Sequence, residues 1–131
     1  MCNLDREIIL DLFQQIDEAL DTIVRRFETV PNSEFFDAAE EGRERRDGLC
    51  MLYEAVGESL KKIDKITQGC LLSRYSEIHW KGVMKFRDVI AHNYFEINSE
   101  VLFTICQNHL PDLSKAVKKI IGDLTPLPEQ P

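Results

Sequence analysis

The 131-residue sequence contains no apolar run that approaches the roughly 20 residues needed to span a bilayer. It also lacks the basic start and short apolar stretch of a secretory signal peptide. Its four cysteines are widely spaced and form no C-x-x-C pair, which argues against a disulfide framework and against a zinc site. These absences predict a cytoplasmic protein with free thiols at all four positions, namely Cys2, Cys50, Cys70 and Cys106.

The sequence also contains fewer basic than acidic residues. It has 16 Lys and Arg and 23 Asp and Glu, which gives a formal net charge of −7. Broad nucleic-acid binding usually depends on a basic surface. Any nucleic-acid site here must therefore be a local basic groove, and the alternative is that the acidity only aids solubility. The sequence has no glycine-rich phosphate loop and no Glu-x-x-His pair, so it predicts neither a P-loop nor a ferritin-like metal site.

Helical periodicity, by contrast, is present along most of the chain. Apolar side chains recur every three or four residues from Leu4 to Val30, which predicts an amphipathic helix with Asn3 as its N-cap and Pro31 beyond its end. A second helix is predicted from Ser33 to Gln68, with Gly69 ending it.

The second predicted helix has two features that bear on its packing. Its first part, Asp37–Asp47, is almost wholly polar, so we expect it to extend past the core or to fray. Gly57 interrupts the apolar stripe farther along the same helix. A glycine at such a position indicates the close approach of a neighbouring backbone.

Three shorter helical segments follow. One is predicted from Trp80 to Ala91 or His92, and another begins at the N-cap Asn98 and runs to about Asn108. Pro111 marks a new helix start or a kink before an apolar face that continues to Gly122. Without strand alternation or internal repeats, the pattern predicts an all-α fold, an antiparallel four- to five-helix bundle in residues 1–123, with a flexible proline-rich tail at 124–131.

The chemistry-bearing residues are concentrated near the end of the third predicted helix. Arg87 lies at the margin of its buried stripe, so it must bury its stem while the guanidinium meets an anion or a partner surface. An ideal helix would turn His92 almost to the opposite side. For the two side chains to converge, either the helix loosens near His92 and Asn93, or the site combines residues of two subunits.

An arginine and a histidine are sufficient for metal-free RNA cleavage. A histidine can take the proton of a 2′-hydroxyl or protonate a leaving oxygen, and an arginine can stabilise the negative charge on the phosphorus oxygens. A two-fold dimer would place two such pairs in one cleft. The spacing of Arg87 and His92 alone is weak evidence, since it fits a helix-terminal histidine and a surface salt bridge equally well.

Arg87, His92 and Tyr94 form the pattern R-x-x-x-x-H-x-Y, which resembles the signature of HepT-type toxins in the HEPN superfamily. The run from Ile78 to Phe95 is similar to the central block of that family, and the likeness extends roughly from Leu49 to Ile121. One departure is a histidine at position 79, where many relatives carry proline before the tryptophan.

The resemblance implies a HEPN bundle that forms a homodimer and acts as a metal-independent endoribonuclease on tRNA or mRNA, with Arg87 and His92 as its catalytic residues. It further implies the toxin component of a type VII toxin–antitoxin system. The antitoxin would be an MntA-like minimal nucleotidyltransferase that transfers AMP from ATP to Tyr94. ATP would serve that partner, and this chain would need no cofactor and no metal.

Five further residues are candidates for supporting roles. Asp88 and Asn93 flank the motif residues, and Glu58 could orient Arg87 or His92 through a charge-assisted hydrogen bond. Lys81 and Lys85, one turn apart, are candidates for RNA phosphate contacts. The competing hypothesis, which the acidic net charge favours, is a non-catalytic HEPN-fold subunit that docks a nucleotidyltransferase.

Overall fold

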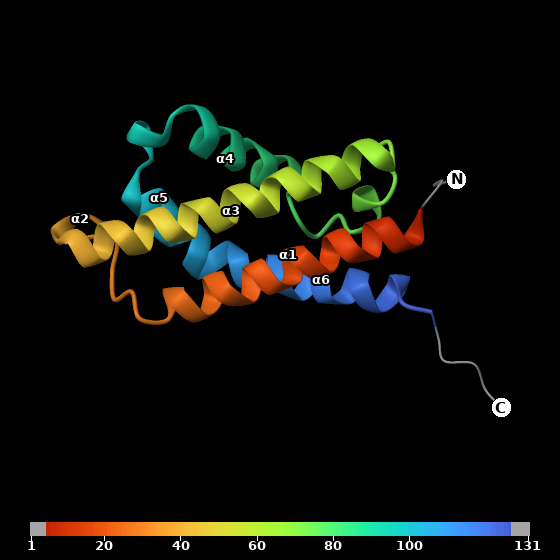
Figure 1. Ribbon diagram of the computed structural model, residues 1–131, viewed down its shortest axis with the longest axis horizontal. Coiled ribbons are helices and arrows are strands. Elements are labelled where there is room, and N and C mark those ends of the chain that lie inside the picture. Colours follow the sequence, from red (N-terminus) through yellow and green to blue (C-terminus); the bar gives the residue numbers. More distant parts are fainter. Residues whose placement is uncertain (1–4, 127–131) are drawn as a thin grey trace.

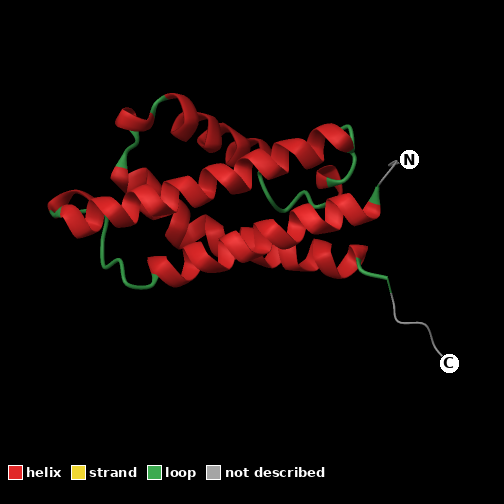
Figure 2. Ribbon diagram, viewed as in Figure 1, coloured by secondary structure: helices red, strands yellow, loops and turns green. Residues whose placement is uncertain are grey.

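The computed structural model describes residues 5–126, and within this range it contains helices and loops but no strand (Figure 2). The predicted all-α fold is therefore confirmed. Short 3₁₀ turns follow α3 and α4, at Leu72–Arg74 and Tyr94–Glu96, and a π-helical turn precedes α6 at Ile105–His109. The α-helices are α1 (Arg6–Phe27), α2 (Phe35–Ala38), α3 (Glu40–Ile66), α4 (Trp80–His92), α5 (Ser99–Thr104) and α6 (Leu110–Leu124).

The helices form an antiparallel bundle. Helix α1 runs antiparallel to both α3 and α6 and packs against both, while α4 lies along the outer side of α3 (Figure 1). One stripe of α1, spaced by three and four residues, is at most 1% exposed and supplies the centre of the core. These residues are Ile9, Phe13, Ile16, Leu20 and Ile23. The arrangement leaves α4 at the edge of the molecule, with α3 as its main support.

The first helix is shorter than its apolar pattern suggests. Its N-cap is Asp5, whose carboxylate accepts a hydrogen bond from the Ile8 amide at 3.4 Å. Asn3, the predicted cap, lies outside the described residues. The helix ends at Phe27, because Val30 already belongs to a turn in which its amide donates to the Phe27 carbonyl.

The second predicted helix is divided into α2 and α3. The chain is extended at Ala39 (φ −154°, ψ 170°), which separates the two helices. The polar segment 37–47 is mostly exposed and extends past the end of α1, as one of the two predicted alternatives has it, but it does not fray (Figure 1). Helix α2 folds back on α3 and buries Phe36 completely. Gly42 makes this possible, because a Cβ there would lie 1.6 Å from the Phe35 carbonyl oxygen.

The ends of the other helices follow their local signals closely. Helix α3 closes through Gln68 (φ 54°) and Gly69 (φ 76°), and the Gly69 amide donates to the Asp64 carbonyl at 2.8 Å. Asn98 caps α5 by accepting from two backbone amides. Helix α6 extends to Leu124, one residue into the predicted tail, most of which lies outside the described residues.

The cysteines do not all match the prediction. Cys50 and Cys106 are free and buried, and burial raises the pKa of the Cys50 thiol to about 11 and that of Cys106 to about 12. Cys70 is disulfide-bonded, so the prediction of a free thiol is wrong there. The separation of cysteines along a chain does not reveal their distance in space. Cys2 lies outside the described residues.

None of the helices in residues 5–126 is both long and apolar enough to cross a membrane.

Candidate active site

The stem of Arg87 packs directly on the backbone of α3. A Cβ built on Gly57 would lie 2.3 Å from the Arg87 Cβ and 2.6 Å from its Cγ, so only a glycine leaves room for this contact. The close approach predicted for Gly57 is confirmed, although the approaching group is a side-chain stem. The contact fixes where the arginine leaves α4.

The guanidinium of Arg87 is held by two carboxylates. One of its terminal nitrogens lies 2.7 Å from a Glu58 oxygen, and the other lies 3.0 Å from Asp88 Oδ1. The side chain is only 17% exposed, and its Nε is buried without a hydrogen-bond partner among the described residues. The hydrogen bond to Asp88, together with the charges of Glu58 and Asp88, raises the Arg87 pKa, so the group stays charged.

Lys61 completes this network from α3. Its ammonium donates to Asp88 Oδ1 at 2.8 Å, the same oxygen that accepts from Arg87. These two hydrogen bonds, that from Lys61 first, lower the pKa of Asp88 below its ordinary value of 3.8. The predicted pairing of Glu58 with Arg87 is thus present, whereas the participation of Lys61 was missed, because its place in a run of surface lysines resembles a solvated helix face.

The Gly57 contact predicts opposite effects for two glycine substitutions. Gly57→Ala should destabilise the protein by about 1–3 kcal/mol, because the new methyl group collides with the Arg87 stem. Gly122→Ala is the matched control in α6, where no atom lies within 4 Å of the new methyl, and it should stabilise by about 0.4–1 kcal/mol. Urea unfolding measures both values. A Gly57→Ala protein as stable as the Gly122→Ala protein would contradict the contact.

His92 is the last residue of α4 and is exposed. The helix does not loosen before it, and the backbone departs from helical geometry at Asn93 (φ −135°, ψ 45°). At about 100° per residue, His92 therefore leaves the helix about 140° away from Arg87. Within the described residues, its imidazole makes no hydrogen bond or ion pair. A single chain does not bring the two motif side chains together.

The outward side of α4 instead aligns His92 with two lysines. Lys81, Lys85 and His92 are all exposed, and their positions on a helix of 3.6 residues per turn fall within about 40° of one another. The structure therefore places two groups of predicted site residues on different sides of α4. Arg87 and its carboxylates are on the side of α3, and the two lysines and the histidine face solvent.

The two aromatic residues after the motif histidine differ in environment. Tyr94 is half-buried against the core, and its ring meets that of Phe95 edge-on with centroids 6.0 Å apart. Phe95 itself is 99% exposed. The 3₁₀ turn at 94–96 directs this side chain to solvent.

The family of the chain follows from its sequence. The sequence profile of the family described as Ribonuclease HepT-like matches residues 16–120, and this span includes Glu58, Arg87, His92 and Tyr94. The chain belongs to the HepT-like ribonuclease family.

Similar proteins carry names that agree with this family. "Putative RNase MJ0127" of Methanocaldococcus jannaschii is 24% identical over 119 residues, which cover 91% of this HepT-like chain and 88% of that protein. "Putative RNase TTE0752" of Caldanaerobacter subterraneus is 29% identical over 52% of this chain and 57% of its own length. "Putative RNase MJ0125" of M. jannaschii is 31% identical over 54% of this chain and 58% of its length. No solved structure matches the chain.

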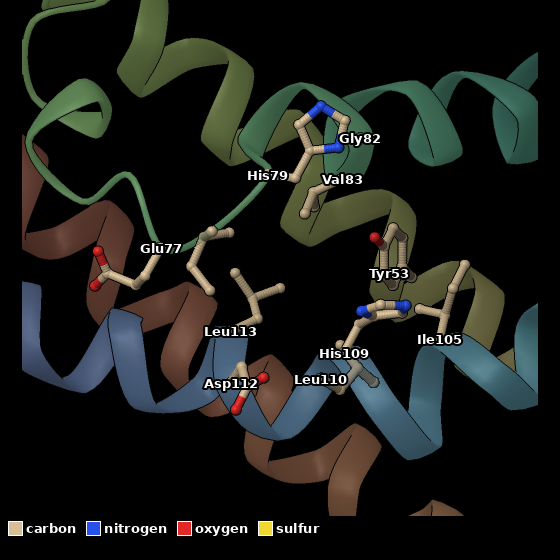
Figure 3. Close-up of a pocket in the computed structure, with 11 residues that line it drawn as sticks. Tyr53, Glu77, His79, Gly82, Val83, Ile105, His109, Leu110, Asp112 and Leu113 are labelled. Carbon is tan, nitrogen blue, oxygen red and sulfur yellow. The ribbon is translucent and has the colours of Figure 1, made fainter.

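The HepT-like chain also has a cavity of about 340 Å³ that none of the motif residues lines (Figure 3). It lies between the start of α4, the middle of α3 and the π-helical turn that leads into α6. Within the described residues, no group of three or more His, Cys, Asp or Glu side chains is arranged to hold a metal ion. The motif residues therefore lie apart from the cavity, with His92 exposed and the Arg87 side chain largely covered.

Proposed function

We propose that this HepT-like protein is a metal-independent endoribonuclease whose active site is assembled by two copies of the chain. The observation that carries the proposal is the fixed Arg87, with its stem on Gly57 and its guanidinium between two carboxylates, in a chain of a ribonuclease family. A guanidinium that is permanently charged and held in one position is suited to bind a phosphodiester.

The separation of Arg87 from His92 supports a homodimer. The two side chains leave α4 about 140° apart, so a second chain related by two-fold symmetry would have to bring a second motif to the same cleft. The outer end of α4 offers a surface for this contact, since Phe95 is fully exposed there. A large apolar side chain with no cover, here beside the half-buried ring of Tyr94, is a candidate contact for a second chain.

The reaction would be an internal transfer at phosphorus. One His92 imidazole takes the proton of the 2′-hydroxyl, and the 2′-oxygen then bonds to phosphorus while the bond to the 5′-oxygen breaks. The second His92 of the dimer protonates the leaving 5′-oxygen. Arg87 stabilises the negative charge on the non-bridging oxygens. To bind the guanidinium, the phosphodiester must compete with the carboxylates of Glu58 and Asp88. Lys81 and Lys85 bind flanking phosphates beside His92.

Control of this activity would come from a partner protein. In the proposed type VII toxin–antitoxin pair, an MntA-like nucleotidyltransferase joins the α-phosphorus of ATP to the Tyr94 hydroxyl oxygen, which loses its proton as pyrophosphate leaves. ATP is used by the partner, and this chain requires no cofactor of its own. The added phosphate would sit two residues from His92 and repel RNA phosphates.

The test is cleavage of tRNA by the purified protein in the presence of EDTA. We expect fragments that end in 2′,3′-cyclic phosphate, from a protein with twice the mass of one chain in solution. Absence of cleavage at an excess of protein, combined with tight binding of the nucleotidyltransferase, would instead favour a non-catalytic HEPN-fold docking subunit.

A further inference from the structure

The cavity beside α4 has an apolar floor and a nearly buried hydroxyl. Val83 of α4 and Leu113 of α6 contribute to the floor, and Tyr53 of α3 contributes the hydroxyl. The volume of about 340 Å³ is at the lower end of the range of small-molecule sites. The cavity is therefore large enough for a single flat ring system.

Tyr53 presents a hydroxyl that is free to bind a ligand. Its side chain is 4% exposed, and its ring packs edge-on against Phe86 with centroids 5.1 Å apart. Its hydroxyl makes no hydrogen bond with any residue that the structure describes. In Figure 3 the ring lies beside His109 with its oxygen directed toward the cavity. Burial raises the pKa of Tyr53, so the group is a donor at neutral pH. An unpaired hydroxyl that faces a cavity is available to donate a hydrogen bond to a ligand.

Four of the residues that line the cavity carry ionisable polar side chains. Two are imidazoles, those of His79 and His109, and two are carboxylates, those of Glu77 and Asp112. All four residues are exposed, and none forms a side-chain hydrogen bond or ion pair with another described residue. His109 closes the π-helical turn at 105–109, a local geometry that is frequent at functional sites.

This set of groups selects a particular kind of ligand. Two carboxylates in the lining of the cavity disfavour a phosphate, so the part that enters must be neutral or cationic. Carboxylates accept hydrogen bonds from the exocyclic amino groups of bases, and an imidazole can stack on a base. An apolar floor suits the faces of a planar ring. The combination matches a nucleobase that carries an amino group.

We infer that the cavity lined by Tyr53, His79 and His109 binds a nucleobase with an exocyclic amino group. The inference rests on the proposed ribonuclease function, because the base would belong to the RNA substrate. It would be the base of a nucleotide away from the cleaved phosphodiester. The site would then select the sequence of the RNA, whereas the motif would perform the chemistry.

The three histidines of the chain provide the readout. Two of them, His79 and His109, line the cavity, and His92 belongs to the motif. Their imidazole Cε1–H signals in a proton NMR spectrum can be assigned with single His→Gln variants. Cytidine at millimolar concentration should shift the signals of His79 and His109 and leave that of His92 in place.

Matched ligands and variants sharpen the test. Uridine, with a carbonyl in place of the amino group, should bind at least about fivefold more weakly than cytidine, and inosine more weakly than adenosine. Tyr53→Phe should weaken cytidine binding about fivefold while keeping the ring on Phe86. Tyr75→Phe is the control, because that hydroxyl donates to Asp123 outside the cavity.

The outcomes separate this inference from the proposed nuclease. If the nucleosides shift neither His79 nor His109, or shift only His92, the base site is refuted even when the protein cleaves RNA. The same refutation follows if uridine binds as tightly as cytidine. If nucleosides bind as expected but a short RNA does not shift the same two signals, the site takes a free nucleoside and its role in RNA selection is refuted. Base binding without cleavage would count against the nuclease and leave the site intact.

Discussion

Arg87→Ala and His92→Ala should each lower the rate of RNA cleavage by about a hundredfold or more. Removing one group that stabilises charge on the reacting oxygens costs about two to three orders of magnitude, and loss of a general acid or base costs a similar factor. Arg87→Lys should also fail, because an ammonium cannot span Glu58 and Asp88 as the guanidinium fork does. Rates are measured with one RNA substrate, at equal protein concentration.

Two controls separate lost chemistry from lost structure. Arg87→Met keeps an alkyl stem on Gly57 while removing the charge, so it should unfold near the wild-type urea concentration and still be inactive. Arg43→Ala removes an exposed arginine that pairs with Glu40 at the start of α3, far along the helix from Gly57, and should cleave at the wild-type rate. Cleavage by folded Arg87→Ala protein at the wild-type rate would refute the proposed role of this residue.

Tyr94→Phe should abolish modification by the nucleotidyltransferase. Incubated with the partner and ATP, the wild-type protein should gain mass in units of AMP, and the variant should gain none. The environments of the three tyrosines favour this position, because Tyr53 and Tyr75 are buried while Tyr94 is half-buried at the edge of the molecule. An enzyme that transfers AMP must reach the hydroxyl oxygen directly.

The same experiment has an internal control. Tyr75→Phe should be labelled like the wild-type protein, since the Tyr75 hydroxyl is engaged with Asp123 at 2.6 Å. Unmodified Tyr94→Phe protein should retain RNA cleavage, because the hydroxyl is the site of control and takes no part in the reaction. Persistent labelling of Tyr94→Phe by intact mass spectrometry would show that the assignment of the modified residue is wrong.

The bundle could be predicted from the sequence where the determining signals are local. Apolar spacing defined α1, the αL glycine ended α3 at Gly69, and Asn98 capped α5. The break at Ala39 could not be predicted in this way. It depends on the contact between Gly42 and the Phe35 carbonyl, and a short polar segment does not reveal that it will fold back over its own helix.

In the candidate site, too, some features could be predicted from local sequence signals and others could not. The motif pattern identified Arg87 and His92, but their helical angle left two possibilities open, a loosened helix end or a site shared by two subunits. The structure shows that the helix does not loosen before His92. The role of Lys61 depends on a shared oxygen of Asp88, a contact between residues 27 positions apart. The exposure of Phe95 depends on a 3₁₀ turn for which the sequence contains no distinct signal. The first is a tertiary contact, and the second is a local turn that the sequence does not reveal.

Because α4 rests on α3 through one side only, the residues that stabilise its position lie on one face, and of the proposed catalytic pair only Arg87 belongs to that face. Val83, Ile90 and the Arg87 stem hold it to the bundle. Lys81, Lys85 and His92 touch nothing that the bundle needs, so substitutions among them would typically change stability by no more than about 0.5 kcal/mol. Substitutions at these three positions therefore test RNA binding and cleavage with little effect on folding.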